Sequence, residues 1–100
     1  MIHHSMTNKK TIWITGGSTG IGKAVAIKFA KSGWNVAISA RRENLLDEVA
    51  KINNNIHVFP LDVTDKNNCK LVFEKIKNKF ENIDICFFST GTWDPKKEKI

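Results

Sequence analysis

The chain has 100 residues and a mass of 11.3 kDa, enough for one small domain and too short for two that each bury a core. Hydrophobic residues make up 41% and charged residues 26%, which is globular usage and excludes a disordered or fibrous chain. The net charge of +6 comes from lysines spread over every segment, so it does not predict a nucleic-acid partner.

Targeting signals and paired cysteines are not apparent in the sequence. No apolar run approaches the roughly 18 residues of a membrane span, and the start MIHHSMTNKK lacks the apolar centre of a signal peptide. We therefore expect a cytoplasmic protein with no membrane partner. Cys69 and Cys86 lie far apart inside apolar patterns, and we interpret them as buried free thiols, with no disulfide and no metal site.

Short β-branched and apolar runs alternate with segments whose apolar residues recur at helical spacing. The first run, KTIWIT, is typical of a strand and stops at a glycine cluster. The predicted strands are residues 10–15, 34–40, 56–61 and 83–89, and the predicted helices are residues 21–32, 44–52 and 65–80. In the first helix we expect one buried face made of Ile21, Ala24, Val25, Phe29 and Ala30.

Residues at the ends of these segments support the assignment. Gly33 is placed to end the first helix, and Thr64 is the predicted N-cap of the third. Pro60 restricts its strand to a sheet edge or a strand terminus. The last strand, IDICFFS, is apolar on both faces, as buried parallel strands are.

The order of the segments predicts the fold class. A β-α-β-α-β-α-β chain forms a parallel sheet with right-handed crossovers and helices on both faces. We therefore expect the N-terminal half of a Rossmann-type, doubly wound α/β domain, truncated after its fourth strand. No repeat or linker divides residues 1–100, and residues 1–9 and 93–100 are expected to be flexible.

The segment TGGSTGIG stands directly between the first strand and the first helix. Gly16 permits a tight turn, Gly20 lets the backbone approach a pyrophosphate, and Gly22 lets the helix lie close to the strand. The helix N-terminus offers free N–H groups and partial positive charge, and Ser18 and Thr19 add hydroxyl donors. These features predict a dinucleotide phosphate site. The alternative is a glycine-rich turn that binds nothing.

The same segment resembles the TGxxxGxG signature of the short-chain dehydrogenase/reductase family. Asp62, Val63 and Thr64 resemble its Asp-Val-Thr segment, whose first two residues flank the adenine ring. The fourth strand with Gly91 is similar to the family's Asn-Asn-Ala-Gly element, although Phe88, Ser89 and Thr90 replace its first three residues. The resemblance spans residues 10–92, and it implies that Ile21, Asp62, Val63, Ser89 and Gly91 join the glycine loop in binding the cofactor.

The end of the second predicted strand indicates which nicotinamide cofactor is bound. NAD sites normally place an acid there, about 20 residues beyond the glycine loop. This chain has Ala40, Arg41 and Arg42 instead, and guanidinium groups bind a 2′-phosphate that a carboxylate would repel. We therefore predict NADP(H) in preference to NAD(H). The alternative is that both arginines only begin the second helix and pair with Glu43 or Asp47.

The 100 residues contain no tyrosine. Members of the resembled family transfer hydride between NAD(P)(H) and a carbonyl or alcohol, with a Ser, Tyr and Lys set in which the tyrosine is general acid or base. The resemblance therefore implies a cofactor-binding portion whose catalytic half is absent. The small-molecule substrate and a homo-oligomer are then expected only in a full-length form. The alternative function is a non-catalytic dinucleotide-binding or regulatory module.

Overall fold

The computed structural model describes residues 9–16, 20–62 and 64–88. Strands and helices alternate within these residues in the predicted order, and only their ends differ from the prediction. The elements are β1 (Thr11–Thr15), α2 (Gly20–Lys31), β2 (Asn35–Ser39), α3 (Glu43–Ala50), β3 (Ile56–Val58), α4 (Lys66–Phe80) and β4 (Ile85–Phe88).

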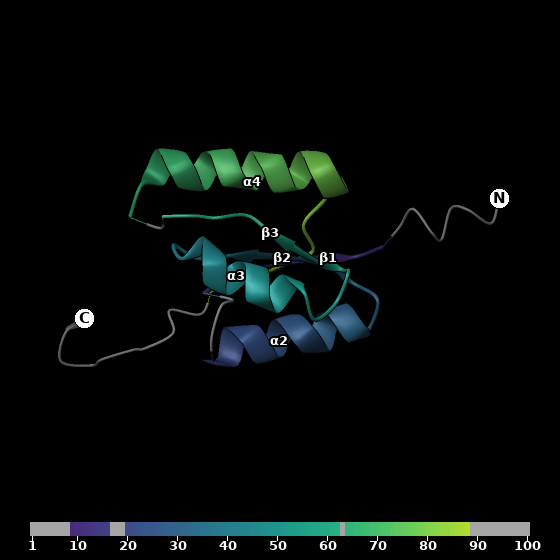
Figure 1. The fold of residues 1–100 in the computed structure, drawn as a ribbon. Helices are drawn as coiled ribbons and strands as arrows, with labels where there is room; N and C mark the ends of the chain where they lie inside the picture. Colours follow the sequence, from purple (N-terminus) through teal and green to yellow (C-terminus); the bar gives the residue numbers. More distant parts are fainter. Residues whose placement is uncertain (1–8, 17–19, 63, 89–100) are drawn as a thin grey trace, which may run out of the picture.

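All four strands are parallel and form one sheet in the order β3-β2-β1-β4. Helix α4 covers one face, and α2 and α3 cover the other (Figure 1). The strand order turns back at β1, since the first three strands extend in one direction and β4 is added on the other side. This confirms the predicted half of a doubly wound α/β sheet.

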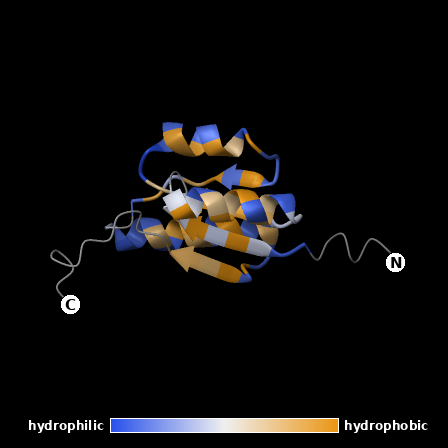
Figure 2. Ribbon diagram, turned by 90° about the horizontal axis from the view of Figure 1, so that it is seen from below, coloured by the Kyte–Doolittle hydropathy of each residue, from blue (hydrophilic) through white to orange (hydrophobic). Residues whose placement is uncertain are grey.

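The alternation of side chains along β1 divides the hydrophobic core into two parts. Ile12 and Ile14 point to the α2 and α3 side, and Trp13 points to α4. Both isoleucines are almost completely buried, and each contributes about 1.5–3 kcal/mol by leaving water. Each helix turns one apolar side toward the sheet. Hydrophobic and hydrophilic residues therefore alternate along the helices in Figure 2.

The buried face of α2 differs from the prediction. Gly22, Ala26 and Ala30 are its buried residues, whereas Ile21 is 69% exposed and Ala24 is exposed. The prediction was therefore right for Ala30 and wrong for Ile21 and Ala24. The physical reason is the distance between the helix and the sheet. Small side chains spaced four residues apart let the axis of α2 approach the sheet closely, and the larger side chains of α2 pack at the sides of this contact.

The first turn of α4 is capped by a different residue from the one predicted. The Asp65 carboxylate accepts hydrogen bonds from the N–H groups of Asn67 and Asn68 at 3.0 and 3.2 Å. Thr64 instead donates its hydroxyl hydrogen to Asp62. The prediction of a Thr64 cap was wrong by one residue, because aspartate and threonine both suit this position and stand next to each other.

Strand β3 lies at the sheet edge, as Pro60 predicts. The ladder to β2 continues on both sides of this proline, from Phe59 N–H to Ile38 C=O at 2.9 Å and from Leu61 N–H to Ala40 C=O at 3.0 Å. Alternate residues of a parallel strand donate to the same neighbour, so the missing N–H of Pro60 falls on the outer side of the sheet.

Strand β4 is far less covered than its apolar sequence predicts. Phe88 is 66% exposed, and Cys86 is exposed, so the expectation of two buried thiols was wrong for Cys86, while Cys69 is half-buried. The reason is that β4 ends the sheet, and no other strand of the described chain pairs with its outer edge. Although Cys86 is exposed as a residue, its thiol is partly desolvated, and this raises the pKa of the thiol.

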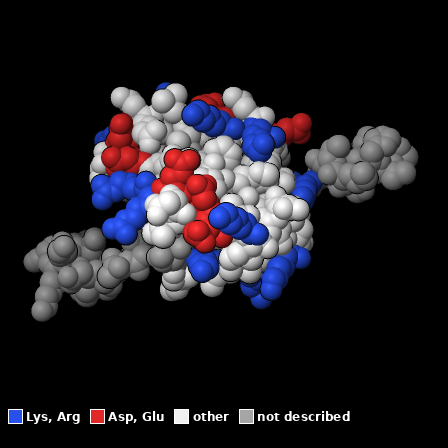
Figure 3. Space-filling view, in the orientation of Figure 1, with Lys and Arg blue, Asp and Glu red and all other residues white. Residues whose placement is uncertain are grey.

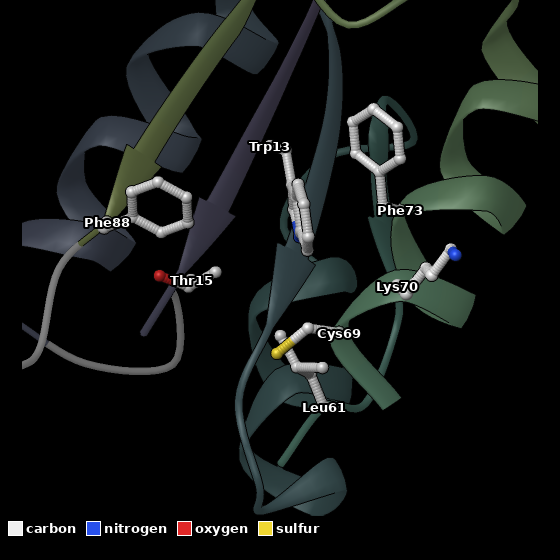
Figure 4. Close-up of a pocket in the computed structure, with 7 residues that line it drawn as sticks. All are labelled: Trp13, Thr15, Leu61, Cys69, Lys70, Phe73 and Phe88. Carbon is white, nitrogen blue, oxygen red and sulfur yellow. The ribbon is translucent and has the colours of Figure 1, made fainter. Parts of the chain in front are cut away.

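An apolar cavity of about 420 Å³ opens between β4 and α4 (Figure 4). The Trp13 ring stands between the rings of Phe73 and Phe88, with centroids 6.1 and 6.3 Å away. The cavity is lined by Trp13, Thr15, Leu61, Cys69, Lys70, Phe73 and Phe88. This face of the described chain is therefore prone to association, because large apolar side chains are exposed to solvent beside an unpaired strand edge.

We expect the 100-residue chain, expressed by itself, to self-associate through this face. Phe88→Ser should shift sedimentation velocity profiles toward the 11.3 kDa monomer, because it removes the most exposed ring of the patch. Ile52→Ser is the matched control, since Ile52 is also about half exposed but lies after α3. A monomeric wild-type chain, or equal effects of the two substitutions, would contradict this prediction.

Candidate functional site

The candidate site starts where β1 ends, at Gly16. This residue has a φ of 78°, in the left-handed region that glycine adopts without strain. Its N–H donates to the Ser39 carbonyl at 2.7 Å, which ties the start of the loop to the end of β2. Gly17, Ser18 and Thr19 lie outside the described residues. Gly16 therefore stands at the carboxyl edge of the sheet, beside the end of β2.

Helix α2 begins on the other side of this loop, at Gly20. Its φ is 59°, and a Cβ atom at this position would have no atom within 4 Å. The space beside Gly20 is therefore open. The first turn of α2 carries no acidic residue, so the free N–H groups and the positive end of the helix dipole face no competing carboxylate. Together these features suit an anion such as a phosphate.

The end of β2 leads into two exposed arginines. Arg42 is the N-cap of α3 through its backbone carbonyl, which accepts from Leu45 and Leu46 N–H, and its side chain makes no capping bond. In the part of the chain that the structure describes, neither guanidinium lies within 4 Å of a carboxylate. The predicted alternative, pairing with Glu43 or Asp47, is therefore not formed, and both cations remain available to a ligand.

Asp62 follows β3 at the same edge of the sheet. Its Oδ1 accepts the Thr64 hydroxyl at 2.6 Å and the Thr64 N–H at 3.0 Å. These two bonds, the hydroxyl first, lower the pKa of the Asp62 carboxyl, and the charge of Arg41 adds a smaller effect. Asp62 is therefore ionised at neutral pH.

Arg41 and Asp62 share one open cavity of about 350 Å³. It is lined by Arg41, Pro60, Leu61, Asp62 and Asn68. The tertiary structure thus brings together the ends of β2 and β3 and the first turn of α4, and the sequence analysis did not single out Asn68. The signal for it was present, since an asparagine in the first turn of a helix readily bonds a neighbouring backbone group.

The other candidate residues divide into two groups. Gly22 is buried in the first turn of α2, and Ile21 is exposed beside the glycine loop. Val63, Ser89 and Gly91 lie outside the described residues. Among described side chains, no group of three potential ligands could hold a metal ion. No described helix has the length and apolar content that crossing a membrane requires.

Charges are mixed on the surface. Figure 3 shows lysine and arginine side chains interleaved with acidic ones on the face that it presents. On this face the picture shows no single broad positive patch, so the positive groups that suit an anion are local ones at the carboxyl edge, namely the α2 N-terminus and the arginine pair.

We expect Thr64→Val to raise the pKa of the Asp62 carboxyl toward the ordinary value for aspartate. The hydroxyl bond is the largest cause of the lowered pKa, and valine keeps the size of the side chain but not the donor. Thr64→Ser keeps the hydroxyl and should keep the pKa low. An NMR titration of the Asp62 carboxyl measures both, and an unchanged pKa in the valine variant would show that the bond is not formed.

Comparison with known proteins places this geometry in a family. The chain matches the short chain dehydrogenase family over residues 10–99. It is 36% identical over 97 residues to a dehydrogenase/reductase SDR family protein 7-like of Dictyostelium discoideum, covering 88% of this chain and 31% of that protein.

Solved structures agree. A short chain dehydrogenase from Bacillus anthracis aligns with a TM-score of 0.74 and 36% identity, covering 80% of this chain and 35% of that one. The 3-ketoacyl-(acyl-carrier-protein) reductase from Brucella melitensis, solved with NADH, aligns with a TM-score of 0.73 and 29% identity over 77% of this chain and 32% of that one. The chain thus spans about a third of the length of these relatives. With its parallel βα sheet and TGGSTGIG loop, this chain belongs to the short-chain dehydrogenase/reductase family of oxidoreductases, with the family's NAD(P)-binding fold.

Proposed function

We propose that the protein is an NADP(H)-dependent oxidoreductase that transfers hydride between the cofactor and a carbonyl or alcohol substrate. The residues of this chain hold the cofactor. Family membership and the Rossmann-type sheet support the general activity. The nicotinamide, when bound, carries the hydride.

The observation that carries the NADP(H) preference is the state of Arg41 and Arg42. Both are exposed at the end of β2, both are free of carboxylate partners among the described residues, and no acid occupies the position that binds a ribose 2′-hydroxyl in NAD sites. A 2′-phosphate would give these two cations a direct ion pair, which no described carboxylate forms with them within 4 Å.

The remaining contacts follow the carboxyl edge of the sheet. We assign the pyrophosphate to the α2 N-terminus, with Gly16, Gly20, Ile21 and Gly22 shaping the loop around it. Asp62 accepts hydrogen bonds and suits the amine of the adenine ring. On the strength of the sequence motifs, the assignment also includes Ser18, Thr19, Val63, Ser89 and Gly91.

In the full-length protein we expect NADPH to bind at least tenfold more tightly than NADH, a difference of about 1.4 kcal/mol. Replacing Arg41 and Arg42 together by alanine should remove this preference, because the 2′-phosphate loses both guanidinium contacts. Titration of cofactor fluorescence measures each affinity. The double replacement of Lys28 and Lys31 by alanine is the control, since it removes the same charge at the far end of α2. Equal affinities of the unmutated protein for the two cofactors would refute the assignment.

We expect Gly20→Ala to weaken NADPH binding at least tenfold, because its methyl group occupies the open space beside the helix N-terminus. Gly33→Ala is a matched control: Gly33 also has a positive φ, of 89°, and no atom within 4 Å of a built Cβ, but it lies beyond the other end of α2. Both substitutions place a side chain at a positive φ, so each strains the backbone. Equal binding by the two variants would mean that the phosphates lie elsewhere.

A further inference from the structure

Asn68 makes a contact that connects α4 to the end of β3. Its side-chain carbonyl oxygen accepts the Asp62 N–H at 2.9 Å. The position of Asn68 is itself fixed, because the Asp65 carboxylate caps the first turn of α4 and accepts the Asn68 N–H. Asn68 also lines the cavity that Arg41 and Asp62 share.

The bond between Asp62 and Asn68 lies directly after the last hydrogen bond between β3 and β2. The last bond of the β3–β2 ladder runs from Leu61 N–H to the Ala40 carbonyl, so the N–H of the next residue, Asp62, points away from β2. The Asn68 side chain provides the acceptor for this N–H. Without it, the backbone at Asp62 would be tied only by its carbonyl, which accepts the Asp65 N–H at 3.0 Å.

The carboxylate of Asp62 is held on one side only. Both bonds from Thr64 go to Oδ1, and no described group donates to Oδ2. With the backbone N–H, the backbone carbonyl and Oδ1 engaged, Oδ2 is the acceptor that Asp62 can offer to a ligand. Its direction depends on the backbone of Asp62.

We infer that Asn68 is a positioning residue that aims the free carboxylate oxygen of Asp62 at the adenine amine of the bound cofactor. This inference rests on the proposed function, since it assumes that a dinucleotide binds at this edge of the sheet. Asn68 itself need not touch the cofactor. One hydrogen bond is a small part of the stability of a domain, so its loss affects binding without destroying the fold.

The first experiment measures NADPH binding by the full-length protein. Asn68→Ala should weaken it on the order of fivefold, which is what one misplaced hydrogen bond costs. Asn67→Ala is the matched control, because Asn67 lies in the same turn and uses only its backbone N–H. In an Asp62→Ala background, Asn68→Ala should cause no further loss, because the group that it positions is gone.

The second experiment separates positioning from general support of the helix. A cofactor analogue with hypoxanthine in place of adenine carries an oxygen where the amine stands, so it cannot donate to Asp62. The unmutated protein should prefer NADPH over this analogue, and Asn68→Ala should reduce that preference. Asn68→Asp keeps the acceptor oxygen and an acid favours a helix N-terminus, so this variant should fold and retain the preference. The ratio cancels effects of the new charge on the phosphates, which both ligands share.

The outcomes distinguish this inference from the proposed function. If the unmutated protein does not bind NADPH, the proposed function is wrong and the inference fails with it. If it binds, but Asn68→Ala and Asn67→Ala bind alike, or the loss persists in the Asp62→Ala background, only the role of Asn68 is wrong. If Asn68→Ala does not fold, the preference of Asn68→Asp decides: a lost preference despite the retained acceptor overturns the inference.

Discussion

The parallel pairing of β1 with β2 on one side and β4 on the other is the constraint on which the rest of the structure depends. Thr15 lies level with Ser39 of β2 and with Phe88 of β4, so these three strands end at one edge of the sheet. Two further bonds hold β1 to β2 there: the Trp13 indole N–H donates to the Ser39 hydroxyl at 2.9 Å, and Gly16 N–H donates to the Ser39 carbonyl. Because this register is fixed by buried groups, the carboxyl ends of these three strands are held close together.

The same edge concentrates charge of both signs in a small space. The helix end at Gly20 and the cations at Arg41 and Arg42 favour anions, while Asp62 remains ionised through its bonds to Thr64. A dinucleotide carries both kinds of group that such a site can satisfy, namely phosphates and an amine donor. The proposed site would therefore contact one molecule at several points along the edge.

The two faces of the sheet are covered by helices to different extents. Helices α2 and α3 cover the side of Ile12 and Ile14, whereas α4 alone covers the side of Trp13 and leaves the Trp13, Phe73 and Phe88 rings around an open cavity. The carboxyl edge of the sheet adjoins that cavity, because Leu61 lines both it and the cavity of Arg41 and Asp62.

The sequence by itself determined the order of elements, the fold class and most of the candidate site. Alternating and helical periodicities are local, and TGGSTGIG, the arginine pair and Asp62 each stand at the end of a strand, where parallel strands meet at one edge. Only the tertiary structure decided which residues of α2 are buried, how far β4 is exposed, which residue caps α4, and that Asn68 holds Asp62. Those features depend on how closely a helix approaches the sheet, on which strand forms its edge, and on which groups meet across a loop. These features are decided by how segments far apart in the sequence pack against one another. The spacing of residues along a single segment does not predict them.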